Sequence, residues 1–119
     1  MTEQKKQHTL KKDKYVNARG GNSYFLNLCC SKCTQYLALY QKDGHGALIR
    51  LYLDRIFEPR ELSKLQFEKT GKKDMPNLKC LRCNSLIGIP MVYEPEQRLA
   101  FLLIRGSFVK KKWSPNVTK

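Results

Sequence analysis

Cys30-Ser31-Lys32-Cys33 and Cys80-Leu81-Arg82-Cys83 are the two stretches that decide the fold of this 119-residue chain. Each is a Cys-x-x-Cys hook, in which a two-residue spacer lets both sulfurs turn toward one point. The hooks are separated by 46 residues, against the roughly 15 to 20 of a minimal two-hook metal module. We therefore expect strands to lie between them.

The cysteines are better suited to metal than to disulfides. The chain has 5 cysteines, an odd number, and residues 1–23 contain no apolar stretch able to form a signal-peptide core. No apolar run approaches the roughly 18 residues that a membrane span needs. We expect a cytoplasmic protein, or a nuclear one in a eukaryote, with no membrane partner and with reduced thiols.

Two hooks supply four thiolates, the ligand set of a closed tetrahedral zinc site. We predict one structural Zn²⁺ bound by Cys30, Cys33, Cys80 and Cys83. Cys29 with Cys33 would leave a three-residue spacer, which is also chemically feasible. We prefer Cys30 because its spacing matches that of the second hook.

The residues around the cysteines agree with this prediction. Lys32 and Arg82 occupy the third position of each hook, where a cation offsets the formal charge of about −2 on a four-thiolate zinc site. Asn84 can adopt the left-handed conformation with which such turns close, whereas Thr34 is less suited to it. Neither hook is followed by a convincing helix, which argues against a thiol redox site.

Strand patterns surround the first hook. Residues 24–28 run into it and residues 36–40 leave it, and both segments are rich in aromatic and large apolar side chains. A glycine turn at 43–46 precedes a long apolar segment at 47–57. We predict a hairpin between 36–40 and 47–57.

A second hairpin is predicted after the second hook, from residues 85–93 and 98–104 with a turn at 94–97. Pro90 places part of its first arm at a bulge or a sheet edge. A short helix is expected near 58–65. The fold class is therefore mainly β, with two antiparallel hairpins or small sheets pinned by the four-cysteine zinc site.

Charge divides the chain into three parts. The net charge is +13, of which residues 1–23 and 110–119 carry +4 each and residues 24–109 carry +5. Segments of low hydrophobicity and one sign of charge do not repay the entropy of ordering. We therefore expect two basic flexible tails on a zinc-binding β domain at 24–109.

A strongly basic chain attracts phosphate backbones. The candidates for nucleic-acid contact are Lys5, Lys6, Lys11, Lys12, Lys14, Arg19, Lys110, Lys111, Lys112 and Trp113. Tyr15 and Trp113 have rings on which unpaired bases could stack beside those cations. The simpler interpretation is that lysine-rich tails only keep the protein soluble.

Several spaced residues point to a known family. They are, in order, Cys30-x-x-Cys33, Leu37-Ala38, Gly44-x-Gly46-Ala47, Cys80-x-x-Cys83-x-x-Leu86-x-Gly88 and Tyr93-Glu94. Over residues 24–109 this pattern resembles the Yippee proteins and, more broadly, the β-tent zinc domains. The resemblance implies two antiparallel sheets at an angle, a four-cysteine zinc site at their apex, and a cleft that holds a peptide or small ligand in several members.

Catalysis is not expected. Methionine sulfoxide reductase B is similar in its widely spaced Cys-x-x-Cys pairs, but it needs a further cysteine downstream, and none follows Cys83. The 2 histidines lie near no convincing nucleophile, and four protein ligands leave a zinc ion no open position for water.

The chain should be a small zinc-binding protein that contacts RNA or DNA. The alternative is an adaptor that binds a protein or ligand in the β-tent cleft.

Overall fold

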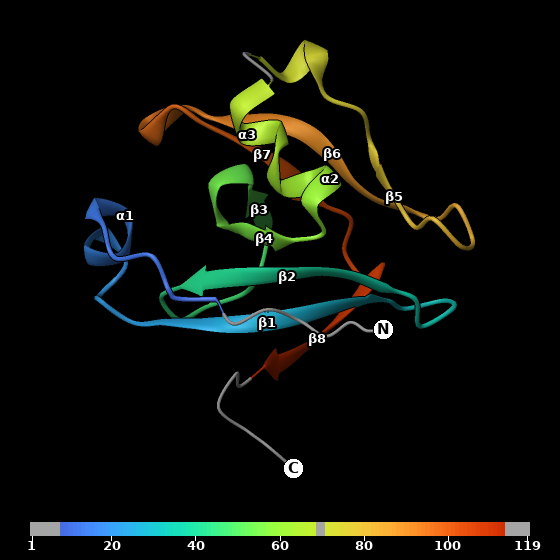
Figure 1. Cartoon of the computed structure of the whole chain (residues 1–119), viewed down its shortest axis with the longest axis horizontal. Helices are drawn as coiled ribbons and strands as arrows, with labels where there is room; N and C mark the ends of the chain where they lie inside the picture. Colours follow the sequence, from blue (N-terminus) through green and yellow to red (C-terminus); the bar gives the residue numbers. More distant parts are fainter. Residues whose placement is uncertain (1–7, 69–70, 114–119) are drawn as a thin grey trace.

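The computed structural model describes residues 8–68 and 71–113, which form two four-stranded antiparallel sheets (Figure 1). The strands are β1 (Ser23–Cys30), β2 (Tyr36–Asp43), β3 (Arg50–Tyr52), β4 (Ile56–Glu58), β5 (Leu78–Lys79), β6 (Leu86–Tyr93), β7 (Arg98–Leu103) and β8 (Phe108–Trp113). Sheet A has the order β4-β2-β1-β8 and sheet B the order β3-β7-β6-β5. The predicted mainly β fold is confirmed.

Each sheet contains one hook as the turn of a hairpin. The first hook joins β1 to β2, which pair from Ser23 opposite Asp43 to Cys29 opposite Tyr36. The second hook joins β5 to β6, which pair through Leu78 opposite Gly88. Both hooks lie at the same end of the molecule (Figure 1).

The second predicted hairpin is confirmed. Strands β6 and β7 pair from Gly88 opposite Leu103 to Tyr93 opposite Arg98, around the 3-10 turn η3 (Glu94–Glu96). A Cβ atom on Gly88 would lie 3.2 Å from the Cβ of Phe101, tighter than ordinary van der Waals contact. Glycine therefore lets the two strands approach at this position.

The first predicted hairpin is wrong in one arm. Residues 47–57 do not form one strand, because β3 pairs with β7 in sheet B and β4 returns to pair with β2 in sheet A. The 3-10 turn η1 (Leu53–Arg55) separates the two strands. Leu51, Tyr52 and Leu53 are all buried in succession, a pattern that a strand with one solvent face cannot provide. These three residues are buried because the chain crosses from sheet B to sheet A at this point.

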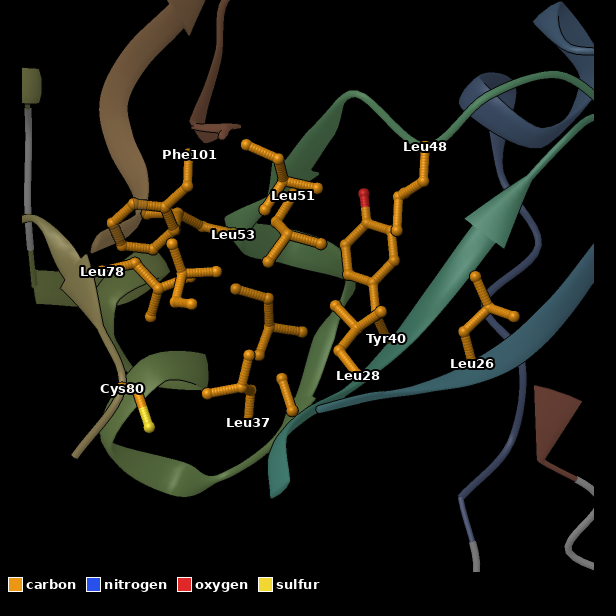
Figure 2. Close-up of a cluster of buried hydrophobic side chains, with 14 of the residues drawn as sticks. Leu26, Leu28, Leu37, Tyr40, Leu48, Leu51, Leu53, Leu78, Cys80 and Phe101 are labelled. Carbon is orange, nitrogen blue, oxygen red and sulfur yellow. The ribbon is translucent and has the colours of Figure 1, made fainter. Parts of the chain in front are cut away.

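The core lies between the two sheets. Leu28 and Tyr40 enter it from sheet A, and Leu51 and Phe101 enter it from sheet B (Figure 2). Each of these side chains is no more than 2% exposed. The core therefore belongs to neither hairpin alone, and it forms only when the sheets face each other.

The predicted short helix is present as two single-turn pieces. They are α2 (Arg60–Ser63), with Pro59 as its N-cap, and α3 (Leu65–Glu68). Leu65 is buried in the core and Leu62 packs against it, at the spacing of three that one helical face requires.

The described part of the chain has no helix long and apolar enough to cross a bilayer. The 3-10 turn η2 (Lys72–Asp74) precedes β5.

The N-terminal segment differs from the expected flexible tail over residues 8–23. It contains helix α1 (Lys14–Ala18), whose N-cap Asp13 accepts hydrogen bonds from the backbone N–H groups of Tyr15 and Val16. Val16 is buried, and the backbone of Lys11 makes two hydrogen bonds with the fully buried amide of Gln41. Buried contacts that lie far apart in sequence therefore hold this segment.

Two buried arginines attach α1 to the sheets. Arg55, with its side chain 1% exposed, donates to Asp13 at 2.7 Å and to Asp43 at 2.8 Å. Its hydrogen bond and positive charge hold the pKa of the Asp13 carboxyl below its usual value. Arg98 lies between the rings of Tyr15 and Tyr52, with its guanidinium carbon 3.8 Å from each centroid. Both arginines are removed from water, and acidic groups and aromatic rings compensate their charges.

The C-terminal boundary also differs from the expectation. Residues 110–113 belong to strand β8, which pairs along β1 with Leu28 opposite Lys110 and Leu26 opposite Lys112. The sequence disguises this strand because its lysines stand on the open edge of sheet A and need no apolar cover. Residues 1–7 and 114–119 of the predicted tails lie outside the described residues.

Replacing Arg55 tests how the N-terminal segment is held. Arg55→Met leaves Asp43 buried without its cation, so we expect the free energy of unfolding to fall by about 3 to 5 kcal/mol in urea. Proteolysis after Lys12 and Lys14 should accelerate because α1 loses its anchor. Arg105→Met, at an exposed turn, should change stability by no more than about 0.5 kcal/mol. Equal stability of the two variants would contradict this account.

Candidate metal centre

The first hook is a tight turn closed by backbone hydrogen bonds. The N–H of Cys30 donates to the carbonyl of Gln35 at 2.8 Å, and the N–H of Thr34 donates to the carbonyl of Cys30 at 3.0 Å. Thr34 has a φ of 67°, which is unusual for a β-branched residue. The turn therefore needs a left-handed residue even where the sequence does not favour one.

The second hook repeats this geometry. The N–H of Cys80 donates to the carbonyl of Ser85 at 2.9 Å, and the N–H of Asn84 donates to the carbonyl of Cys80 at 2.8 Å. Asn84 has a φ of 64°, as its side chain predicted. Two turns of the same shape thus present two cysteines each.

The four cysteine sulfurs of the hooks meet between the sheets. The Sγ atoms of Cys30, Cys33, Cys80 and Cys83 all lie within 4.8 Å of one another. Across the hooks, Cys30 and Cys83 are 3.6 Å apart and Cys33 and Cys80 are 3.4 Å apart. Zn–S bonds of about 2.3 Å in a tetrahedron place sulfurs about 3.8 Å from one another. The cluster therefore fits one tetrahedral metal ion such as Zn²⁺.

Cys29 is not part of the cluster. It precedes Cys30 in β1, so its side chain points to the opposite face of sheet A. Its thiol is partly buried, and the strand alternation that turns Cys30 inward keeps Cys29 away from the other sulfurs. The structure thus brings Cys30 to the second hook.

Nearby donors favour the thiolate forms of Cys80 and Cys83. The N–H of Cys83 points to the Sγ of Cys80 at 3.5 Å and lowers the pKa of that thiol. The hydroxyl of Ser85 lies 3.0 Å from the Sγ of Cys83, and hydrogen bonds from Ser85 lower the pKa of Cys83 to about 6. The N–H of Lys32 lies 3.4 Å from the Sγ of Cys30. Such donors orient and stabilise metal-bound sulfur.

The turn between β7 and β8 supports the first hook. Ser31 donates from its N–H to Ser107 at 3.0 Å and from its hydroxyl to Gly106 at 2.8 Å. The N–H of Ile104 in turn donates to Ile87 in β6 at 2.7 Å. Because β6 begins just after the second hook, these bonds connect both hooks to the crossing from sheet B to sheet A.

The cluster is buried on one side only. Cys30 and Cys80 are each 1% exposed, whereas Cys83 is exposed and Cys33 is partly so. Lys32 and Arg82 stand exposed at the tips of the hooks.

The described cations that were predicted to contact nucleic acid lie on two different parts of the fold, the N-terminal segment and strand β8. Lys110, Lys111 and Lys112 are exposed together along β8. Arg19 is committed elsewhere, since it makes a bidentate pair with Glu96 at 2.9 Å for each bond.

The remaining N-terminal cations divide between bound and free. Lys11 donates from Nζ to the carbonyl of Asp54 at 2.6 Å, while Lys12 is exposed. Lys14 lies over the ring of Tyr15, with Nζ 5.3 Å from the centroid. The predicted contacts at Lys5 and Lys6 fall outside the described residues.

Both aromatic rings proposed for base stacking have protein contacts. Trp113 meets Phe25 edge to face, with ring centroids 5.3 Å apart. Tyr15 covers the guanidinium of Arg98. Their present contacts serve packing within the domain.

An apolar groove lies beside the second hook, a feature the sequence did not localise. It has a volume of about 370 Å³, and its walls include Tyr36 and Leu37 from β2, Leu62 from α2, and Leu78 and Leu81. Leu81 is 96% exposed at the tip of the hook. Strand alternation could indicate Leu37 and Leu78, but only the packing of α2 and the second hook against the sheets brings Leu62 and Leu81 to the same groove.

No family model, curated protein or solved structure was found to match the chain. The metal centre therefore rests on the geometry of the four sulfurs alone.

Adjacent cysteines provide a matched test of this centre. Cys30→Ser should remove tight Zn²⁺ binding and at least about 3 kcal/mol of the roughly 10 to 16 kcal/mol that structural zinc contributes. Cys29→Ser should retain one Zn²⁺ and the stability of the parent, because its thiol faces away from the cluster. Native mass spectrometry with and without chelator measures occupancy, and urea unfolding measures stability. Zinc retained in Cys30→Ser and lost in Cys29→Ser would reverse the assignment.

Proposed function

We propose that this chain is a non-catalytic zinc protein that binds RNA or DNA through the phosphate backbone, with strand β8 as its main contact. The observation that carries the proposal is the run of three exposed lysines, Lys110 to Lys112, on an edge strand. The strand fixes the backbone positions of these lysines and places Lys110 and Lys112 on one face of the sheet and Lys111 on the other. Phosphate contacts of this kind supply affinity without reading sequence.

The neighbouring strand continues the basic surface. Lys112 lies over the ring of Tyr24 in β1, with Nζ 5.1 Å from the centroid. The ring of Tyr24 is partly buried. An aromatic ring beside a lysine is an arrangement that single-strand binders use.

The zinc centre supports a binding role rather than a catalytic one. Four cysteine ligands would fill a tetrahedral Zn²⁺, which leaves no position for an activated water. The ion would then act as a staple that holds sheet A, and with it β8, against sheet B. In this proposal the four-cysteine centre stabilises the fold, and strand β8 binds the nucleic acid.

A charge-matched pair of variants tests the role of β8. Lys110→Gln with Lys112→Gln should weaken binding to a single-stranded oligonucleotide and reduce the magnitude of the slope of log K against log salt by about 1.4. Lys72→Gln with Lys73→Gln removes the same charge from the exposed η2 turn and should leave the slope nearly unchanged. Fluorescence anisotropy between 50 and 300 mM salt provides the measurement. An equal effect of both pairs would mean that net charge, not β8, drives binding.

The apolar groove beside the second hook favours a second function, an adaptor that binds a protein segment. Its leucines and the exposed Leu81 offer a site for an apolar side chain, and the resemblance to β-tent domains supports this use of a cleft. Leu81→Glu should then abolish capture of a partner from nuclease-treated lysate, whereas Leu86→Glu, exposed outside the groove, should not. Captured proteins that are lost on nuclease treatment alone would favour the nucleic-acid function instead.

A further inference from the structure

A small basic pocket lies at the end of the molecule opposite the hooks, where β2 ends near α1 (Figure 1). It has a volume of about 170 Å³, below the roughly 300 Å³ at which pockets for drug-sized ligands begin. Its walls come from the end of β2, the loop 44–49, the start of β3, and Arg19. The pocket can therefore hold a small group rather than a whole nucleotide.

The acidic side chain in the wall is already satisfied. Asp43 accepts hydrogen bonds from Ser23 and Gln41 on Oδ1, and it pairs with Arg55 through Oδ2. Arg19 is likewise neutralised by Glu96. Among the described residues, the two pocket cations that form no ion pair with an acid are Lys42 and Arg50.

Lys42 is a buried cation with weak partners. It is 8% exposed, and its Nζ donates to the carbonyls of Asp43, Gly44 and His45 at 3.4, 3.1 and 3.5 Å. Among residues 8–68 and 71–113, no carboxylate forms an ion pair with it. A buried ammonium held only by carbonyl dipoles gains from an anion placed beside it.

Arg50 supplies the second charge. Its guanidinium lies over the ring of Tyr93, with the carbon 4.4 Å from the centroid, and it pairs with no acid in the described chain. Stacking occupies the face of the guanidinium but leaves its N–H edge available. That edge can bind two oxygens of a phosphate at once.

The loop adds neutral donors. The side chains of Asn22 and His45 are hydrogen-bonded, with Nδ2 of Asn22 2.9 Å from Nε2 of His45. The N–H of Leu48, a buried residue, makes no hydrogen bond with any described residue. Leu48 lines the pocket, so this N–H is available to donate to a bound anion.

We propose that this pocket binds a phosphate-class oxyanion, with Lys42 and Arg50 as its charged ligands and loop 44–49 as the source of neutral donors. Free phosphate and the terminal phosphate of a nucleic-acid strand share this chemistry. The site does not depend on the lysines of β8, so it stands or falls separately from the nucleic-acid proposal.

Inorganic phosphate titrated into the zinc-loaded full chain tests the site, with backbone amides followed by NMR. We expect saturable shifts at Gly46, Leu48 and Arg50, and an affinity at least about tenfold lower in Arg50→Gln, because a charge-assisted bidentate contact is lost. Arg50→Lys should recover part of that loss. Arg105→Gln, an exposed arginine outside the pocket, should bind as the parent does.

Three results would overturn the proposal. They are shifts confined to other parts of the chain, linear shifts that do not saturate, and equal weakening in Arg50→Gln and Arg105→Gln. A thermal scan of each variant confirms that Arg50→Gln remains folded. If that variant unfolds, the saturation and location of the shifts in the parent protein decide alone.

Oligonucleotides distinguish the two sources of the phosphate. A strand with a 5′-phosphate should shift the loop 44–49 amides at lower concentration than the same strand with a 5′-hydroxyl if the strand end is the ligand, and Arg50→Gln should abolish the difference. Equal behaviour of both strands, with shifts only from inorganic phosphate, assigns the site to the free ion. Phosphate binding without any oligonucleotide binding would reject the β8 proposal and leave the pocket standing.

Discussion

The convergence of four cysteine sulfurs within 4.8 Å is the constraint on which the rest of the structure depends. Each hook is only a local turn, and each hairpin alone is marginal in water. Because the hooks belong to different sheets, satisfying both from one ion fixes how the sheets face each other. A domain with so thin a core gains most from such a staple. The buried leucines then fill the gap between the sheets, whose width at one end is set by the cysteine cluster.

The opposite end is held by ionic rather than metal contacts. Arg55 and Arg98 are buried, and both reach acids that lie far away in the sequence. Such pairs add little net stability, but breaking one leaves a buried charge. They therefore specify where α1 and the N-terminal segment dock. The cysteine cluster thus holds one end of the two sheets together, and buried ion pairs hold the other end.

The fold divides the basic residues into two groups, those paired with acids inside the domain and those exposed at its surface. Arg19, Arg55 and Arg98 pair with acids inside the domain, whereas Lys110 to Lys112 line an open edge. Lysines on an edge strand also prevent unwanted pairing with another sheet. The same residues can therefore protect the edge and attract a polyanion. Lys42 and Arg50 line one pocket, and neither forms an ion pair with an acid in the described part of the chain.

Local chemistry made much of this protein readable from its sequence: the Cys-x-x-Cys spacing, the left-handed Asn84 and the hairpin of β6 with β7 all follow from neighbouring residues. The sequence did not reveal that 47–57 divides between two sheets, that residues 8–23 dock through Arg55, or that Lys110 to Lys112 form a strand. Each of these depends on partners more than 40 residues away or on a sheet edge that exists only after folding. The sequence by itself therefore determined the ligands and the β character. The tertiary structure decided which charges are buried and which remain free to bind, because burial and pairing are properties of the assembled sheets.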